Sequence, residues 1–210
     1  MAFGHCRCLV ALVELLLLFA VLCLSLTAVA TIVPLKNDFN GDCPLYPTIE
    51  DVGYFNIETN DVINCNYIIG ANAVSAGISL IMMIYVGIEL TMKKRLLSFV
   101  PILQTIISAI LMIIVGTAAG VITVGFNKLC SGLELLVDLW HDYNTCKEWQ
   151  DDDYWDIYDY DGSHFYFYLF SAQIATGISA GIWVAMLIIS FIALVCYTSR
   201  SAEDDETLIL

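Results

Sequence analysis

Four long apolar runs constrain this chain more than any other feature of its sequence. They cover residues 9–33, 68–92, 99–124 and 165–196 of the 210-residue chain. Each exceeds the roughly 18 apolar residues that mark a spanning helix, and 25 helical residues measure about 37 Å, enough to cross a bilayer core. Lipid offers the backbone no hydrogen-bond partner, so each run must be helical. The sequence therefore predicts an all-α membrane protein in which residues 1–210 form a single four-helix bundle.

The first run has a second interpretation, as a signal peptide. Arg7 precedes the apolar stretch, and Ala28-Val29-Ala30 resembles a cleavage site that would leave a chain beginning at Thr31. The stretch is longer than the about 7–15 apolar residues of a signal peptide, and it contains Glu14. We therefore expect a retained helix, and the N-terminal sequence of the purified protein distinguishes the two.

The basic residues predict which side of the membrane each loop occupies. Five of the eight Lys and Arg residues flank the runs on one side, at Arg7, Lys93–Arg95 and Arg200. Short basic loops stay in the cytosol, and an even number of crossings puts both termini there too. The outer loops 34–67 and 125–164 then lie on the opposite side, and residues 197–210 form a cytosolic tail.

The acidic residues concentrate in the two outer loops. Of the formal net charge of −14, loop 34–67 contributes six acids and one Lys, and loop 125–164 contributes ten acids and two Lys. This charge repels nucleic acid and attracts cations or basic protein surfaces. It also has a simpler interpretation, because charge keeps exposed loops soluble.

Four of the eight cysteines lie in these loops, at Cys43, Cys65, Cys130 and Cys146. An even number in an oxidising compartment indicates two disulfides, and four cysteines allow three pairings. We favour Cys43–Cys65 and Cys130–Cys146 because each loop then closes on itself. No zinc-type Cys-x2-Cys pair occurs in the loops.

Residues 151–162 form an unusual acidic and aromatic segment. Aromatic side chains are common at the centres of protein interfaces, and acids steer a basic partner. The candidate partner-binding residues are Asp153, Tyr154, Trp155, Tyr158 and Tyr160. Calcium binding is a weaker alternative, because aligning Gly162 with the glycine of an EF-hand puts Ile157 and Tyr168 at ligand positions. We therefore expect no metal and no cofactor.

Small and polar residues punctuate the apolar runs. Pairs of small residues at four-residue spacing let helices approach closely, which predicts packing within the bundle or, alternatively, a homo-oligomer. The pairs are Ala73 with Gly77, Gly116 with Gly120, and Gly177 with Gly181. We expect Asn72, Gln104 and Gln173 to form hydrogen bonds between helices. Glu14 and Glu89 are candidate functional groups, although Glu89 can pair with Lys93 one turn away.

The C-terminal tail is acidic, and the sequence predicts that it is disordered. Asp204-x-x-x-Leu208-Ile209 resembles an acidic dileucine sorting signal. That resemblance implies adaptor binding and delivery to endosomes or lysosomes. The expected location is therefore the plasma membrane or the endosomes and lysosomes.

Three segments resemble the transmembrane protein 179 family, including its shorter B-type members. They are Pro34-Leu35-Lys36-Asn37-Asp38-Phe39-Asn40-Gly41-Asp42-Cys43, Val124-Gly125-Phe126-Asn127-Lys128-Leu129-Cys130, and Phe165-Tyr166-Phe167-Tyr168 leading into Ser171-Ala172-Gln173. The resemblance implies a four-helix membrane fold with paired outer-loop cysteines and no catalytic residues. The claudin pattern of Trp and Gly-Leu-Trp in the first loop and the tetraspanin Cys-Cys-Gly are absent, so those families fit less well.

The sequence contains no arrangement that indicates catalysis. It has no nucleophile–base set, phosphate-binding glycine loop or His-Glu-x-x-His motif, so we expect a protein that is not an enzyme. The leading hypothesis is an accessory, interaction or trafficking subunit that contacts lipid and another membrane protein. The alternative is a small ion channel or transporter subunit that uses Glu14, Glu89 and the acidic loops.

Overall fold

The computed structural model describes residues 2–49, 55–56, 62–92, 100–140, 145–151, 155 and 160–207. Its helices are α1 (Ala2–Asp38), α2 (Val62–Met92), α3 (Val100–Trp140), the 3-10 helix η2 (Glu148–Asp151) and α4 (Phe165–Thr207). Two two-residue strands, β1 (Thr48–Ile49) and β2 (Phe55–Asn56), pair antiparallel in the first loop. Each long helix contains a stretch long and apolar enough to cross a membrane. The predicted fold of four spanning helices is confirmed.

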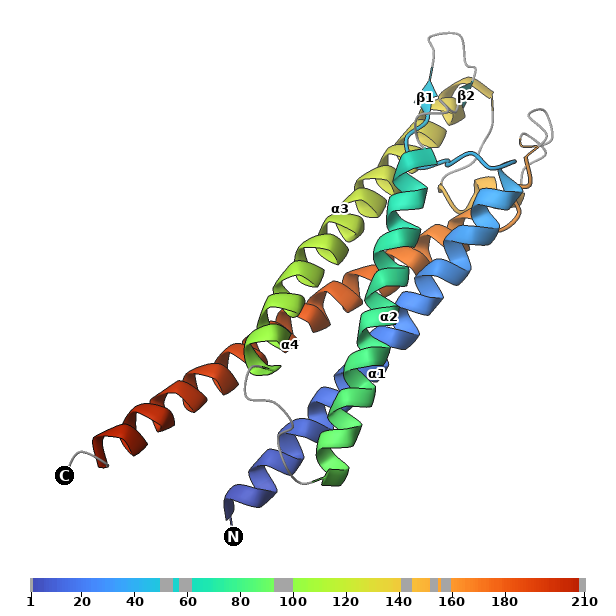
Figure 1. Cartoon of the computed structure of the whole chain (residues 1–210). Coiled ribbons are helices and arrows are strands. Elements are labelled where there is room, and N and C mark those ends of the chain that lie inside the picture. The colour runs from blue at the N-terminus through green and yellow to red at the C-terminus, as the bar shows by residue number, and fades with distance from the viewer. Residues whose placement is uncertain are drawn as a thin grey trace.

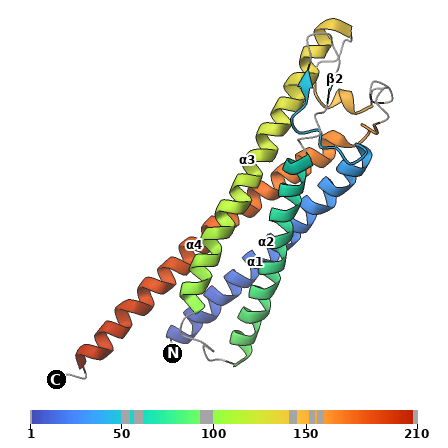
Figure 2. The same cartoon turned by 45° about the horizontal axis from the view of Figure 1, so that its top comes forward.

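The four long helices form a ring with alternating directions (Figure 1). Helix α1 packs on α2 and α4, while α3 packs on α4 and α2, so α1 and α3 lie diagonally opposite each other. Both termini lie at one end of the bundle and the outer loops at the other (Figure 1). We call these the terminal end and the cap end. Near the terminal end, the last turns of α4 extend away from the other helices (Figure 2).

The inward faces of the helices follow alternating spacings of three and four residues. On α3 the buried positions include Ser108, Leu111, Val115, Ala118 and Ile122. This spacing keeps one seam of each helix facing its neighbours, as in other four-helix bundles. Large apolar side chains on the other faces remain exposed, which suits contact with lipid; examples are Leu16, Phe19, Ile81, Ile113 and Ile188.

The helices continue beyond the predicted spans because the inward spacing continues. Helix α1 passes through Pro34 to Asp38, and Leu35 and Phe39 are fully buried just before and just after its end. Just beyond Asp38, the last residue of α1, Asn40 and Gly41 have φ angles of 53° and 95°, and Gly41 N–H donates to Lys36 O at 2.7 Å. Such a left-handed pair closes a helix C-terminus, and glycine adopts it without a steric cost.

The other three helices are also longer than predicted. Helix α2 begins at Val62 and α3 ends at Trp140, with Cys65, Leu129 and Leu133 buried on the added turns. The prediction of a disordered tail over 197–210 is wrong as far as Thr207, which ends α4. The sequence has neither Gly nor Pro after Gly181, so nothing in its backbone chemistry stops this helix.

A layer of polar side chains crosses the middle of the bundle. Ser25 of α1 donates to Ser75 of α2 at 3.2 Å and lies 3.4 Å from the Ser179 hydroxyl of α4. The Trp183 indole N–H donates to Ser75 Oγ at 2.9 Å. These bonds pair hydroxyls that lipid could not satisfy, and they separate an apolar cluster towards the cap from a second one towards the termini.

The prediction that three amide side chains bond between helices is confirmed. The side-chain nitrogens of Asn72 and Gln173 donate to Thr176 and Thr123 hydroxyls, each at 3.3 Å. Gln104 Nε2 donates to Glu14 Oε1 at 3.4 Å. Each bond joins two different helices, so these residues help to set the relative register of the helices.

The small-residue pairs do not pack the helices of the bundle together, so that prediction is wrong. Ala73, Gly77, Gly120, Gly177 and Gly181 are exposed on the outer faces, and Gly116 is half-buried. A Cβ atom added at any of the five glycines would meet nothing within 4 Å. The buried seam instead consists of Leu, Val, Ile, Ala and Ser, because this ring leaves room for side chains of that size between its helices.

Candidate functional site

Two disulfides staple the loops at the cap end of the bundle. Cys43 is bonded to Cys65 and Cys130 to Cys146, with Cα–Cα distances of 5.9 and 5.1 Å. The first bond ties the first loop to α2, and the second ties the chain before η2 back to α3. The predicted pairing is confirmed. We call the described loop residues 39–47, 145–151, 155 and 160–164 the cap.

Trp155 is the centre of the cap rather than part of its surface. Its ring contacts Phe39 and Phe165, with centroid distances of 5.4 and 5.3 Å, and only 1% of the residue is exposed. Its indole N–H donates to Trp149 O at 2.7 Å. The prediction that Trp155 contacts a partner directly is therefore wrong, because the side chain is used to hold the acidic segment against α1 and α4.

Gly162 permits this arrangement of Trp155. A Cβ atom at this position would lie 2.1 Å from Cδ1 of the Trp155 ring, much closer than van der Waals contact allows. The preceding residue, Asp161, donates its backbone N–H to Asp38 O at 3.0 Å. The second loop is thus fastened to the end of α1 immediately beside the buried indole.

Tyr160, which follows Trp155 in the acidic segment, also packs against the end of α1. Its backbone N–H donates to Trp155 O at 3.1 Å, and its ring lies 5.1 Å from that of Phe39. Its hydroxyl donates to Asp42 Oδ2 at 3.3 Å, and burial together with the Asp42 charge raises the pKa of Tyr160. Tyr160 is half-buried, so part of it remains available to a partner. The other candidates, Asp153, Tyr154 and Tyr158, lie outside the described residues.

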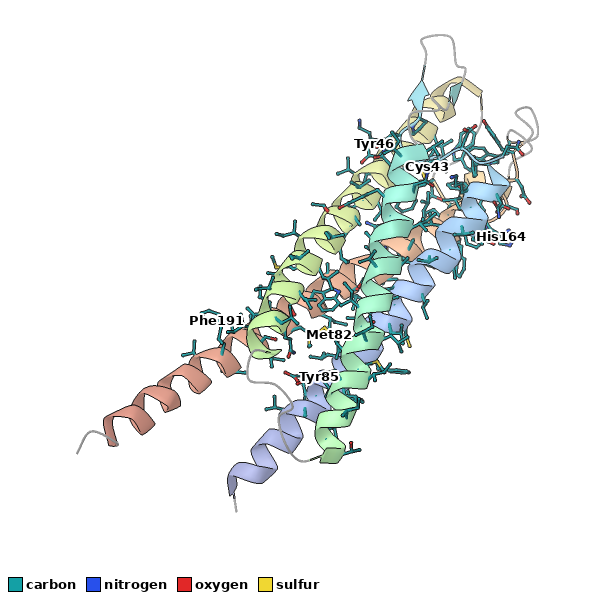
Figure 3. All side chains as sticks on the ribbon, in the orientation of Figure 1. Cys43, Tyr46, Met82, Tyr85, His164 and Phe191 are labelled. Atoms are coloured by element: carbon teal, nitrogen blue, oxygen red, sulfur yellow. A yellow bond between two sulfur atoms is a disulfide. The ribbon has the colours of Figure 1, made fainter. Side chains whose placement is uncertain are left out.

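The first loop lies along α3 through Leu45 and Tyr46. The Tyr46 hydroxyl donates to Val121 O at 2.9 Å, and Lys128 Nζ lies 5.3 Å from the centre of the Tyr46 ring (Figure 3). Leu45 sits directly over Gly125, where an added Cβ would lie 2.8 Å from both Leu45 Cβ and Leu45 O. The absence of a side chain at Gly125 therefore lets the loop touch the helix.

We predict that Gly125→Ala destabilises the cap by about 1–3 kcal/mol, because the added methyl group must push the backbone of the first loop away from α3. The control on the same helix is Gly120→Ala, where the added group meets open space. Thermal unfolding and limited proteolysis of the first loop measure the difference. Equal unfolding temperatures and cleavage rates for the two variants would contradict the predicted contact.

Asp161 is stabilised as a carboxylate at the start of α4. Its side chain accepts hydrogen bonds from Ser163, including the backbone N–H at 3.0 Å, and these bonds lower its pKa. A lowered pKa in the folded chain contributes stability above the ordinary value of 3.8 and loses it as the pH falls through the folded pKa.

We therefore predict that Asp161→Asn lowers the unfolding temperature slightly at neutral pH, and that the difference disappears in acid. Thermal unfolding of both proteins between neutral and strongly acidic pH measures it. A difference that grows as the pH falls contradicts this account of Asp161.

The structure describes the predicted sorting signal only in part, and it does not describe the side chain of Glu89. Asp204 lies in α4, while Leu208 and Ile209 of the dileucine motif lie outside the described residues, as does the side chain of Glu89. Among the described residues, no group of three or more His, Cys, Asp or Glu side chains could hold a metal ion.

The sequence analysis missed the buried serines of α1, α2, α3 and α4. Ser25, Ser75, Ser108, Ser179 and Ser190 all lie on inward faces. Their spacings of three, four, seven or eleven residues from buried apolar neighbours are the signal that a search along each helix face would have found.

The comparisons agree with this architecture. The model of a family described as the Transmembrane protein 179/179B Claudin domain matches residues 10–208, whereas comparison with curated proteins and with solved structures gave no match. Because that description names a claudin domain, the expectation that claudins fit less well is wrong, and the Gly-Leu-Trp pattern is not required for this domain. With four spanning helices, two stapled loops and a match over nearly its whole length, the chain belongs to the transmembrane protein 179/179B family of claudin-like multi-pass membrane proteins.

Proposed function

We propose that this protein is a non-enzymatic accessory subunit that binds another membrane protein through its cap. The observation that carries the proposal is the buried Trp155, which packs between Phe39 and Phe165, close to the point where Asp161 N–H donates to Asp38 O at the end of α1. Loop residues that are already held in place before binding lose little conformational entropy on binding, which favours tight association. Because Trp155 and the Cys130–Cys146 disulfide both hold described parts of the second outer loop, presenting this loop to a partner is the function that fits best.

The charge of the cap favours a partner with a basic surface. Lys36 donates to Asn66 at 2.9 Å, and Lys128 lies over the Tyr46 ring, so both cations have partners within the chain. The acids of loop 125–164 outnumber its two lysines five to one. Such an excess accelerates encounter with a basic surface and makes that step sensitive to salt.

Crosslinking in native membranes, followed by mass spectrometry, tests this proposal. We expect one membrane protein to be linked to the cap or to the acidic segment 151–162 that adjoins it, with recovery falling about tenfold when Asp151, Asp152, Asp153, Asp156 and Asp159 are all changed to Asn. The matched control neutralises Glu203, Asp205 and Glu206 in the tail, keeps Asp204 of the dileucine motif, and leaves recovery unchanged. Equal recovery of the same partner from all three proteins would rule out the cap as the binding surface.

We further propose that the termini are cytosolic and that the tail directs the protein to endosomes or lysosomes. The basic cluster Lys93–Arg95 supports this orientation, and the placement of both termini at one end of the bundle is consistent with it. Changing Leu208 and Ile209 to Ala should raise the amount at the cell surface, measured by surface biotinylation. No change in surface amount contradicts a sorting role.

A channel or transporter subunit is the second candidate, and one contact favours it. The Gln104–Glu14 hydrogen bond places a carboxylate inside the terminal half of the bundle. Cation flux in liposomes that is lost in Glu14→Gln or Glu89→Gln would support this candidate over the accessory role.

A further inference from the structure

A second polar layer lies in the terminal half of the bundle, and it is not fully satisfied. Its members come from three helices: Glu14 of α1, Gln104 and Ser108 of α3, and Ser190 of α4. The hydrogen bond from Gln104 to Glu14 joins the two diagonally opposite helices. These side chains therefore reach each other across the interior of the bundle rather than along its surface.

The central serine layer shows that Glu14 and Ser190 lie at one level. Ser25 and Ser179 are within 3.4 Å of each other on the antiparallel helices α1 and α4. Glu14 lies eleven residues from Ser25, and Ser190 lies eleven residues from Ser179, both towards the terminal end. Eleven helical residues make about three turns and about 16 Å, so both side chains keep the inward direction of the central serines.

Ser108 reaches the same level from α3. It follows Gln104 by four residues, which is about one turn and about 6 Å. The Thr123–Gln173 bond aligns α3 with α4, and from that bond Ser108 is fifteen residues and Ser190 seventeen residues towards the terminal end. The two serines therefore differ by only about 3 Å along the bundle.

Ser108 and Ser190 are buried and have no hydrogen-bond partner among the described residues. They are 0% and 2% exposed, and neither Oγ atom is bonded. Elsewhere in the bundle, Ser79, Thr31 and Thr117 donate to a carbonyl three or four residues earlier, which is the usual solution for a hydroxyl in a helix. Because Ser108 and Ser190 do not form this bond, the donor and acceptor of each hydroxyl remain available inside the bundle.

We propose that Glu14, Gln104, Ser108 and Ser190 bind a compact monovalent cation, either a free alkali ion or the primary ammonium of a lipid head group. The site offers oxygen atoms from a carboxylate, an amide and two hydroxyls, and these are the ligands that hard cations and ammonium groups take. Its one carboxylate balances one positive charge, whereas a divalent ion usually takes several. This site is separate from the cap and does not depend on the proposed function.

Thermal unfolding of the full-length protein in lipid nanodiscs tests the site and identifies the source of the cation. The first arm compares Na⁺ or K⁺ with bulky N-methylglucamine at equal ionic strength, in phosphatidylcholine, whose head group has no N–H donor. The second arm stays in N-methylglucamine and compares phosphatidylethanolamine with phosphatidylcholine. We expect the arm with the true ligand to raise the unfolding temperature by about 3–5 °C at a tenfold excess over its Kd.

Four variants separate binding from packing. Glu14→Gln should abolish the cation response, and Ser108→Ala and Ser190→Ala should each weaken the apparent affinity at least tenfold. In the absence of the ligand, these two serine variants should be as stable as the native protein or more so, because each removes an unpaired buried hydroxyl. The control is Ser79→Ala, a buried serine that donates to Ala76 O at 2.8 Å and should respond like the native protein.

Two outcomes overturn the proposal. The first is a native unfolding temperature that is the same under all conditions of both arms, which would leave only water in the layer. The second is a cation response that persists in Ser108→Ala and Ser190→Ala, which would place the bound cation elsewhere. If Glu14→Gln fails to fold, the response of Ser108→Ala and Ser190→Ala still tests whether the cation binds at this site.

Discussion

Trp155→Ala is expected to cost about 3–5 kcal/mol of stability in the cap, which is the usual range for removing a buried tryptophan. The indole packs between Phe39 and Phe165 and donates its N–H to Trp149 O. Its loss leaves a cavity and an unpaired carbonyl at the point where the second loop meets α1. We expect the acidic segment to become a site of rapid proteolysis while the helices remain in the membrane.

Two further variants show whether packing is the cause. Gly162→Ala should reproduce much of the effect, because its Cβ would lie 2.1 Å from the Trp155 ring. Phe167→Ala is the control, since Phe167 is 59% exposed and its loss removes little buried contact. Limited proteolysis and near-ultraviolet circular dichroism measure the order of the cap. If Trp155→Ala and Phe167→Ala are cleaved at the same rate, Trp155 does not hold the segment.

Removing the Cys43–Cys65 disulfide should cost about 3 kcal/mol, by the loop-closure estimate for a bond that spans 22 residues. Both cysteines are fully buried, so the bond also belongs to the apolar cluster beneath the cap. The double change Cys43→Ala and Cys65→Ala should lower the unfolding temperature and expose the first loop to protease. Binding of a partner should weaken with it if the cap is the binding surface.

The control for this experiment is Cys23→Ala, which removes an exposed free cysteine from α1. It should unfold like the native protein. A reducing agent that enters the cap breaks both disulfides of the native protein but only Cys130–Cys146 in the double variant, so it should lower the unfolding temperature of the native protein by more. If reduction and the double variant both leave the unfolding temperature unchanged, the bond contributes no stability.

Much of the membrane fold was predictable because only a few backbone structures are stable in lipid. Length and polarity alone identified four spanning helices, since a backbone in hydrocarbon must satisfy its own hydrogen bonds. Closing each loop on itself was enough to choose the correct disulfides. Asn72, Gln104 and Gln173 were predictable as interhelical donors because an amide inside a membrane has few other partners.

The direction in which a side chain points was much less predictable. Spacing suggested that Gly116 and Gly120 pack helices together, yet the buried seam of α3 runs through Val115 and Ala118 instead. In a helix that is apolar on all sides, periodicity does not distinguish the face towards lipid from the face towards protein. Composition made Trp155 a candidate for the surface of the acidic loop, although it is buried.

The sequence by itself determined that this chain crosses a membrane four times and bears two acidic, disulfide-closed loops. Those properties follow from length, polarity and cysteine placement, which act locally along the chain. Only the tertiary structure decided that Trp155 anchors the cap and that Ser108 and Ser190 share a level with Glu14. Whether a side chain is buried, and which side chains lie at the same height in the bundle, depends on which helices are neighbours and in what register they pack. Contacts between residues far apart in the chain determine both.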